Sequence, residues 1–175
     1  MVLRPASQRT ARATSQLLRD RVGEFLNSAK SRIVIETKFF YPSFSTYILL
    51  ARQLLANLPV RIFSNAAAAG EPYDRNMLLV GSQFLTGLKF FGADVRFFTG
   101  SLPSGGGQAM HPAGFAPSWG THAKTLVIDD TVILGSYNLD LVSDYLNLEQ
   151  ILVVNSPEFA AATLNSILAR TGKTE

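Results

Sequence analysis

The order of the expected helices and strands is the feature that most limits how this chain can fold. Up to about residue 98, amphipathic helical segments alternate with short runs rich in β-branched and aromatic residues. Three strands then follow with no helix between them, at about 121–128, 132–137 and 148–154. Alternation followed by a run of adjacent strands is typical of an α/β sandwich with a mixed sheet, which is the fold class we expect.

Residues that favour helix ends define the boundaries of the expected elements. Ser43 and Asp74 are candidate N-caps, Gly92 is a stop, and Ser156 followed by Pro157 opens the last helix. In chain order, the expected elements are a helix at 14–29, a strand at 32–41, a helix at 44–57, a strand at 60–64, a helix at 75–91, a strand at 93–98, the three strands above, and a helix from 157.

A long segment rich in glycine, proline and serine precedes the three strands, at 99–120. Loops of this length are uncommon inside a compact domain and are often functional. We expect Phe115 and Trp119 to line a lipid or substrate entrance, and His111 to be an exposed loop residue.

Composition fits one compact domain and excludes several kinds of chemistry. Of the 175 residues, 47% are hydrophobic and 17% charged, as in folded globular proteins. There is no cysteine, which excludes disulfides and thiolate nucleophiles, and two histidines are too few for a self-contained zinc site. We expect residues 1–30 to form a basic N-terminal helix or extension and residues 31–175 to form the domain itself.

Positive charge is concentrated near the N-terminus. Up to Lys38 there are eight basic and three acidic residues, a net charge of +5, against +3 for the whole chain. Such a segment can meet anionic lipid headgroups or nucleic acid, and a solvated helix face explains it equally well. No run of about 18 apolar residues and no secretory signal pattern is found. We therefore expect a cytoplasmic protein that can contact a membrane surface.

Four polar residues mark one end of an apolar hairpin. His122 and Lys124 are two residues apart on one expected strand, so both point to the same face. Ser136 and Asn138 have the same spacing at the end of the next strand. The turn at 129–130 is short enough for a hairpin. The two pairs should therefore lie close together, where leaving them buried and unpaired would be costly.

These residue types suit chemistry at a phosphodiester. Imidazole supplies a nucleophile or base near neutral pH, which makes His122 the candidate catalytic residue. Lys124 supplies a positive charge for phosphoryl oxygens, and the Ser136 hydroxyl and Asn138 amide supply hydrogen-bond donors.

Two further residues fit the same interpretation. Gly135 allows the backbone to approach a ligand closely. Glu149, on the next expected strand, can accept a hydrogen bond from His122 and so fix the orientation of its ring.

The complete pattern resembles the HKD motif of the phospholipase D superfamily. The motif residues are His122, Lys124, Asp129, Gly135, Ser136 and Asn138. The stretch at 135–149 is similar to the one that follows the second HKD motif of bacterial cardiolipin synthases, and about residues 30–170 resemble the C-terminal lobe of such a synthase. This resemblance implies a phospholipase D-like α/β/α sandwich with a mixed β-sheet and a single HKD lobe.

The resemblance also implies a two-step displacement at phosphorus that needs neither metal nor cofactor. In the family, one HKD histidine forms a phosphohistidine, the histidine of a second motif protonates the leaving alkoxide, and water or an alcohol then takes the phosphoryl group. Carried over to this chain, the resemblance assigns the attack to His122. It assigns phosphate binding to Lys124 with Ser136 and Asn138, and the orientation of the histidine to Glu149. We expect Asp129 to have a structural role, tying the hairpin together.

Only one HKD motif is present, so a second must come from elsewhere. In small single-motif nucleases of the superfamily, a twofold dimer brings two motifs together. A homodimer and a missing N-terminal HKD lobe therefore both remain open.

Three functions are compatible with the pattern. The leading one is phospholipid hydrolysis or phosphatidyl transfer, with water or an alcohol as acceptor, because the stretch at 135–149 resembles cardiolipin synthases. The alternative is a dimeric, metal-independent endonuclease, favoured by the single motif, the small size and the basic N-terminal segment. The third is a C-terminal lobe that is inactive alone.

Overall fold

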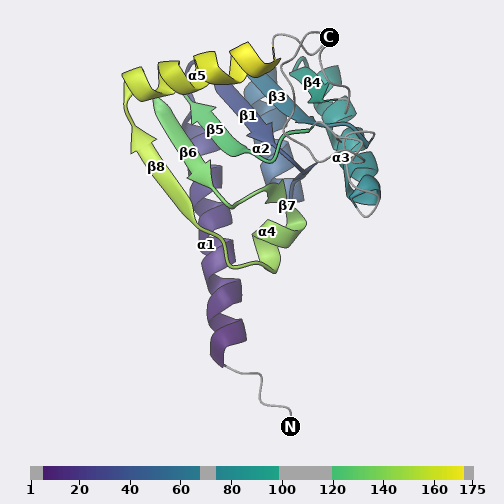
Figure 1. The fold of residues 1–175 in the computed structure, drawn as a ribbon, viewed down its shortest axis with the longest axis vertical. Helices are drawn as coiled ribbons and strands as arrows, with labels where there is room; N and C mark the ends of the chain where they lie inside the picture. Colours follow the sequence, from purple (N-terminus) through teal and green to yellow (C-terminus); the bar gives the residue numbers. More distant parts are fainter. Residues whose placement is uncertain (1–5, 68–73, 99–119, 172–175) are drawn as a thin grey trace, which may run out of the picture.

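Helices cover both faces of a six-stranded mixed sheet (Figure 1). The structure is a computed structural model that describes residues 6–67, 74–98 and 120–171. Its elements are α1 (Ala6–Ser28), β1 (Ile33–Thr37), β2 (Phe40–Tyr41), α2 (Phe44–Leu55), β3 (Val60–Asn65), α3 (Arg75–Phe90), β4 (Asp94–Phe98), β5 (Lys124–Ile128), β6 (Thr131–Gly135), β7 (Leu139–Asp140), α4 (Leu141–Tyr145), β8 (Ile151–Asn155) and α5 (Pro157–Thr171). His111, Phe115 and Trp119 lie outside the described residues.

The strand order of the main sheet is β4-β3-β1-β5-β6-β8. Strands that a helix separates in sequence, β1, β3 and β4, pair in parallel. From β5 onward the pairs β1–β5, β5–β6 and β6–β8 are antiparallel. Parallel strands need a crossover, whereas a short turn can join antiparallel ones, as it does between β5 and β6. The expected mixed sheet is therefore confirmed.

Two hydrophobic clusters hold the layers together. On one face, Leu26 of α1, Leu50 of α2 and Leu85 of α3 pack with strand residues such as Ile35. On the other face, Ile167 of α5 packs in a second cluster, and Figure 1 shows α5 running across that side of the sheet. Because neighbouring residues of a strand point to opposite faces, central strands need apolar side chains on both faces, which β1 and β5 supply in the runs 33–35 and 126–128. The expected α/β/α sandwich is confirmed.

One expected strand is in fact two. The chain bends at residues 38–39, so the segment expected at 32–41 divides into β1 and β2. β2 leaves the main sheet and pairs in parallel with β7 in a separate two-stranded sheet. The short helix α4, unexpected from the sequence, follows β7 directly, and the Asp140 side chain caps it by accepting from Ser143 N at 2.7 Å.

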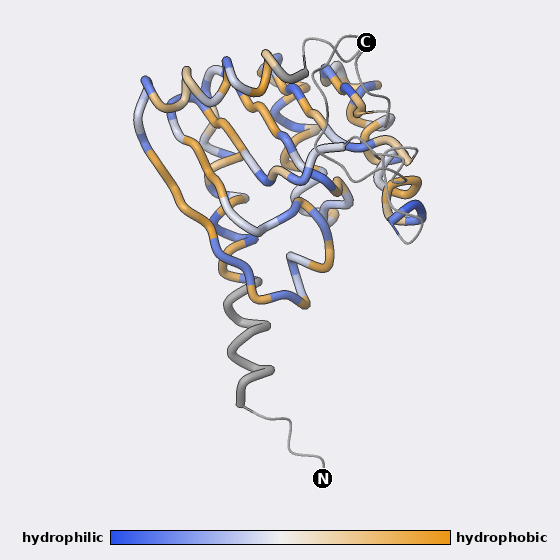
Figure 2. The backbone as a smooth tube through the Cα atoms, in the orientation of Figure 1, coloured by the Kyte–Doolittle hydropathy of each residue, from blue (hydrophilic) through white to orange (hydrophobic). Residues whose placement is uncertain are grey.

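The last strand, β8, forms an exposed edge of the sheet. Figure 2 shows it as mostly hydrophobic along its length, and the side chains of Leu152 and Val153 are largely exposed. An unpaired apolar edge is a surface that another chain or segment can cover.

None of the helices that the structure describes is long and apolar enough to cross a membrane.

Candidate active site

His122 and Lys124 meet at the start of β5, as expected. Lys124 is the first residue of β5 and lies opposite Thr37 in the β1–β5 pairing. The expected strand begins later than residue 121, so His122 lies in the irregular segment just before β5. Lys124 Nζ donates to the backbone carbonyl of His122 at 2.9 Å and lies 3.5 Å from His122 Nδ1. The imidazole and the ammonium group are therefore direct neighbours.

Buried polar residues of two neighbouring strands hold the segment that carries His122. Asn65, at the end of β3, accepts from Thr121 N at 2.8 Å and donates to Thr121 O at 3.0 Å. The Thr121 hydroxyl donates to Glu36 of β1 at 2.8 Å. Sequence reasoning missed Glu36 and Asn65, although a polar residue at the end of a buried apolar strand is the pattern that could have indicated them.

The side chains of Ser136 and Glu149 form a contact that the sequence did not indicate. Ser136 follows β6, and its hydroxyl donates to Glu149 Oε2 while accepting from Gln150 N at 3.0 Å. Glu149 Oε1 accepts from Ser143 Oγ at 2.8 Å and from Asn147 Nδ2 at 3.1 Å. The carboxylate thus takes three side-chain hydrogen bonds, in keeping with its burial.

The expected hydrogen bond from His122 to Glu149 is not among those that the described part of the chain shows. The sheet order gives the reason, because β6 lies between β5, which follows His122, and β8, which follows Glu149. Glu149 therefore reaches Ser136 first. Its carboxylate supports the loops around Ser136 rather than the imidazole within this chain.

Asn138 is placed next to the same cluster. Its backbone N–H donates to Ser143 Oγ at 3.2 Å, and its side-chain Oδ1 lies 3.4 Å from the hydroxyl of Thr37. Since Thr37 lies opposite Lys124, the expected pairs from the two strands do reach one end of the sheet. Ser143 joins them, because its hydroxyl accepts from Asn138 and donates to Glu149.

Gly135 allows a close approach, but to protein backbone. An added Cβ at this position would lie 2.0 Å from the carbonyl oxygen of Gln150. Gly135 pairs with Ile151 at the start of β8, so any side chain would separate the two strands here. The structure therefore explains this glycine by the packing of β6 on β8, whereas the sequence suggested an approach to a ligand.

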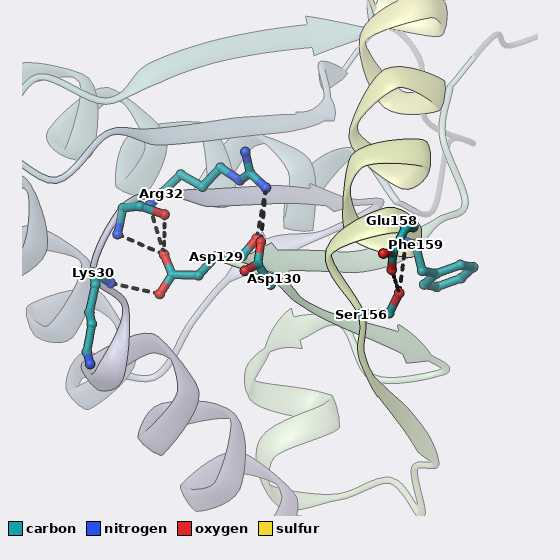
Figure 3. Close-up of polar contacts among 8 residues, drawn as sticks. Lys30, Arg32, Asp129, Asp130, Ser156, Glu158 and Phe159 are labelled. Carbon is teal, nitrogen blue, oxygen red and sulfur yellow. Dashed lines mark hydrogen bonds and ion pairs between the residues drawn. The ribbon is translucent and has the colours of Figure 1, made fainter.

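Asp129 directly follows β5, at the end opposite Lys124, and Figure 3 shows its contacts with Lys30 and Arg32. Its carboxylate accepts from the backbone N–H groups of Lys30, Ser31 and Arg32 at 2.8–3.1 Å and from the Ser31 hydroxyl at 2.7 Å. Burial acts to raise the pKa of Asp129, but these hydrogen bonds outweigh it and hold the pKa below its usual value. Asp129 thus connects the β5–β6 turn to the segment before β1.

Positive charge dominates the electrostatics around His122. The charge of Lys124 lowers the pKa of His122 most, followed by burial and the charge of Lys38, while Asp74 acts in the opposite direction. Burial lowers the pKa of Lys124, and Lys38 adds to this, against Glu149 and Asp140. A lowered pKa favours a neutral imidazole near neutral pH, which is the form that can act as a nucleophile.

Asp74 does not cap α3 as expected. It occupies the N-cap position, but its side chain makes no cap hydrogen bond. Instead, Asp74 Oδ2 lies 2.8 Å from Lys38 Nζ. Sequence reasoning missed this ion pair because it joins two residues across irregular segments, where no periodicity relates them.

A cavity of about 620 Å³ opens at this end of the sheet. It is lined by His122, Lys124, Leu134, Gly135, Ser136, Gln150, Ile151 and Leu152. An imidazole, an ammonium group and a hydroxyl in this lining suit a phosphoryl group, and the leucine and isoleucine side chains suit an apolar neighbour of that group. Within residues 6–67, 74–98 and 120–171, no cluster of acidic, histidine or cysteine side chains is arranged to hold a metal ion.

Sequence comparisons relate the chain to proteins of one family. The model of the family described as "Cardiolipin synthase, PLD-like domain" matches residues 22–169. Uncharacterized proteins from two strains of Helicobacter pylori are each 23% identical over 146 residues, which are 77% of this chain and 26% of each relative. The chain therefore spans about a quarter of the length of the curated relatives it matches.

Structural comparisons find the same fold in proteins of low identity. Nuc from Salmonella typhimurium, a phospholipase D family member, has a TM-score of 0.66 and 18% identity, covering 90% of this chain and 88% of Nuc. NucT from Helicobacter pylori has a TM-score of 0.65 and 17% identity, covering 97% of this chain and 92% of NucT. Phosphatidylserine synthase from Haemophilus influenzae Rd KW20 has a TM-score of 0.65 and 16% identity, covering 90% of this chain and 36% of the synthase.

Proposed function

Because the chain belongs to the family of the phospholipase D-like domain of cardiolipin synthase, we propose that it is a phosphodiesterase in which His122 attacks phosphorus. The observation that carries this proposal is the contact of His122 Nδ1 with Lys124 Nζ at 3.5 Å in the wall of the cavity. The ammonium group favours the neutral imidazole and also offers N–H donors to a phosphoryl oxygen.

The proposed reaction has two displacements. First, a ring nitrogen of His122 forms a bond to phosphorus while the bond to the leaving oxygen breaks, and the leaving alkoxide takes a proton from the histidine of a second HKD motif. Water or an alcohol, losing its proton to that second histidine, then attacks phosphorus and releases His122. Hydrolysis and group transfer thus differ only in the acceptor.

Lys124 and Asn138 are the proposed phosphate-binding residues. Within the cluster of hydrogen bonds, Glu149 has a positioning role: it holds Ser143, and Ser143 accepts from the backbone of Asn138. The Ser136 hydroxyl already donates its proton to Glu149. Ser136 therefore contributes to phosphate binding indirectly, because it lines the cavity and holds the loop before β8 through Glu149 and Gln150.

The proposed substrate is a phospholipid, with phosphatidyl transfer or hydrolysis as the outcome. The family description and the apolar residues that line the cavity, among them Ile151 and Leu152, support this choice. A surface of this kind accommodates the glycerol and acyl carbons next to a phosphate better than it does a second phosphate.

The second candidate is cleavage of nucleic acid by a homodimer. It is favoured by the near-complete coverage of Nuc and NucT, which are chains of similar extent to this one. In either case a second motif is required, from another copy or from another lobe. Exposed apolar residues offer a surface for that partner: Leu152, which lines the cavity, and Leu146 and Leu148, which precede β8 in the chain.

Purified full-length chain tests both candidates. When phosphatidylglycerol vesicles are the substrate and EDTA is present, the proposal expects the wild-type chain to form cardiolipin or phosphatidic acid. The variant His122→Ala should form neither product. Cleavage of DNA in EDTA that is lost in the same variant, with no lipid product, would instead establish the second candidate. Failure on both substrates by a chain shown to be dimeric would contradict the proposed activity.

A further inference from the structure

Lys38 and Asp74 form an ion pair beside the candidate active site that no step above uses. The distance from Lys38 Nζ to Asp74 Oδ2 is 2.8 Å, and the two side chains are 16% and 6% exposed. Lys38 directly follows Thr37, the last residue of β1, which lies opposite Lys124 in β5. The bend after β1 therefore brings a second lysine to the end of the sheet where Lys124 lies.

The bonding of this pair is incomplete. Asp74 Oδ2 is buried and, although ion-paired, receives no well-directed hydrogen bond in the described structure. The ammonium group of Lys38 also lies over the ring of Phe39, 4.7 Å from its centroid. An ammonium group has three N–H donors, so Lys38 can bind a further anionic oxygen while it keeps Asp74.

The charge of Lys38 reaches both active-site groups. It lowers the pKa of His122 and the pKa of Lys124, after the larger causes given above. Two ammonium groups and an imidazole thus converge at one end of the sheet, with Asp74 as the carboxylate paired to one of them. Like charges brought together repel each other, and a bound anion relieves that repulsion.

We propose that Lys38, held by Asp74, is a second phosphate-binding residue of this site and acts with Lys124 on the phosphoryl oxygens of the substrate. This inference rests on the proposed function and extends it. It assigns the ion pair a role beyond linking β1 to α3, and it fits the site to a phosphodiester, whose single negative charge is shared by two non-bridging oxygens.

Inorganic phosphate is the probe that tests this inference without turnover. The chain has two histidines, so the ring signals of His122 can be assigned in NMR spectra by comparison with His111→Gln. Phosphate titrated into the full-length chain should shift the His122 signals. In Lys38→Met the dissociation constant should rise about tenfold, the effect of losing one charge-assisted hydrogen bond.

Two further variants control the measurement. Lys89→Met removes the same charge from the far end of α3, on an exposed side chain, and should leave phosphate affinity unchanged. Lys38→Met leaves Asp74 buried without its partner, so the double variant Lys38→Met/Asp74→Asn is measured in parallel and should show the same loss. Thermal melting confirms that each variant is folded.

The outcomes separate this inference from the proposed function. Equal phosphate affinity in wild type and in the folded double variant would overturn the binding role of Lys38. The same conclusion would follow if the His122 signals of the wild type did not shift when phosphate is added. Phosphate binding that depends on Lys38, in a chain with no activity on lipid or DNA, would support the binding role while contradicting the proposed reaction.

Discussion

The ammonium nitrogen of Lys124 lies 3.5 Å from Nδ1 of His122 and donates to the carbonyl oxygen of the same histidine at 2.9 Å. The backbone hydrogen bond fixes the lysine side chain along the segment that carries the imidazole. As a result, the charge that lowers the pKa of His122 most is also the charge best placed to meet a phosphate oxygen. Under the proposed mechanism, the nucleophile and the group that binds phosphate are therefore coupled.

Replacement of Lys124 by methionine should raise the pKa of His122 towards its ordinary value of 6.5. A nearby positive charge disfavours the imidazolium, so its removal makes protonation easier. NMR titration of the histidine ring signals measures this directly. Lys30→Met, which removes an exposed charge at the other end of β1, should leave the pKa unchanged; an equal shift in both variants would contradict a local effect.

The acid side of the pH profile should reflect the same pKa. Because the pKa of His122 is lowered from 6.5, kcat/KM should stay high as the pH falls through 6.5 and be lost only below it, as the free imidazole becomes protonated. Lys38 also lowers this pKa, so Lys38→Met should move the acid midpoint to higher pH, whatever it does to the absolute rate. A midpoint that does not move in Lys38→Met would mean that another group controls this limb.

The sequence predicted those parts of the site that depend on short-range periodicity. His122 and Lys124 do meet at the start of β5, although His122 lies just before the strand rather than on it. The hairpin brings Ser136 and Asn138 to the same end of the sheet. The mixed sheet followed in the same way from the alternation of helices and strands.

The contacts of Glu149 and Lys38 were not predicted for one physical reason: they depend on the order in which strands and helices lie side by side. The strand order places β6 between His122 and Glu149, and nothing in the spacing of the chain states that order. The ion pair of Lys38 with Asp74 likewise depends on a bend after β1 that divides an apparently continuous strand. Periodicity describes which face a residue occupies, whereas these contacts depend on how elements are arranged across the sheet.

Asp129→Asn should destabilise the fold by about 1–2 kcal/mol, because an amide has one oxygen where the carboxylate has two. Its oxygen can still accept from the backbone N–H groups of Ser31 and Arg32, but its NH2 group cannot accept the hydrogen bond that Oδ2 receives from Lys30 N. The backbone is left-handed at this position, with φ of 52°, and asparagine tolerates that conformation, so the backbone need not change. Urea unfolding measures the effect. Asp130→Asn is the matched control, since Asp130 is exposed and 3.8 Å from Arg32, and should change little.

The same variant should also alter the pH dependence of stability. The folded pKa of Asp129 lies below 3.8, so its carboxylate contributes stability that is fully present above the unfolded pKa and is lost as the pH falls through the folded one. The difference in unfolding free energy between wild type and Asp129→Asn should therefore shrink below about pH 4. A difference that stays constant down to pH 2 would show that the carboxylate charge is not responsible.

Gly135→Ala should cost about 1–3 kcal/mol of stability, because its Cβ would lie 2.0 Å from the Gln150 carbonyl and the β6–β8 pairing must open. Gly23→Ala is the control, since a Cβ there meets only Leu49 Cδ1 at 3.6 Å within helix α1. It should stabilise the chain by roughly 0.5–1 kcal/mol through helix propensity. Unfolding in urea that ranks the two variants in the reverse order would contradict the packing argument.

If two copies of the chain share one active site, an inactive copy should suppress a working one. The proposed mechanism requires a second histidine, whereas the sequence holds one such motif, and a twofold dimer would supply the other from the same surface of the second copy. Refolding wild type with a ninefold excess of His122→Ala at random pairing should leave about a tenth of the activity of wild type alone, because most wild-type chains then pair with a variant. The control uses Lys89→Met as the excess chain, which is itself active and should therefore keep the activity per total chain equal to that of wild type alone. Undiminished activity in the mixture with His122→Ala would show that the second motif is not contributed by another copy.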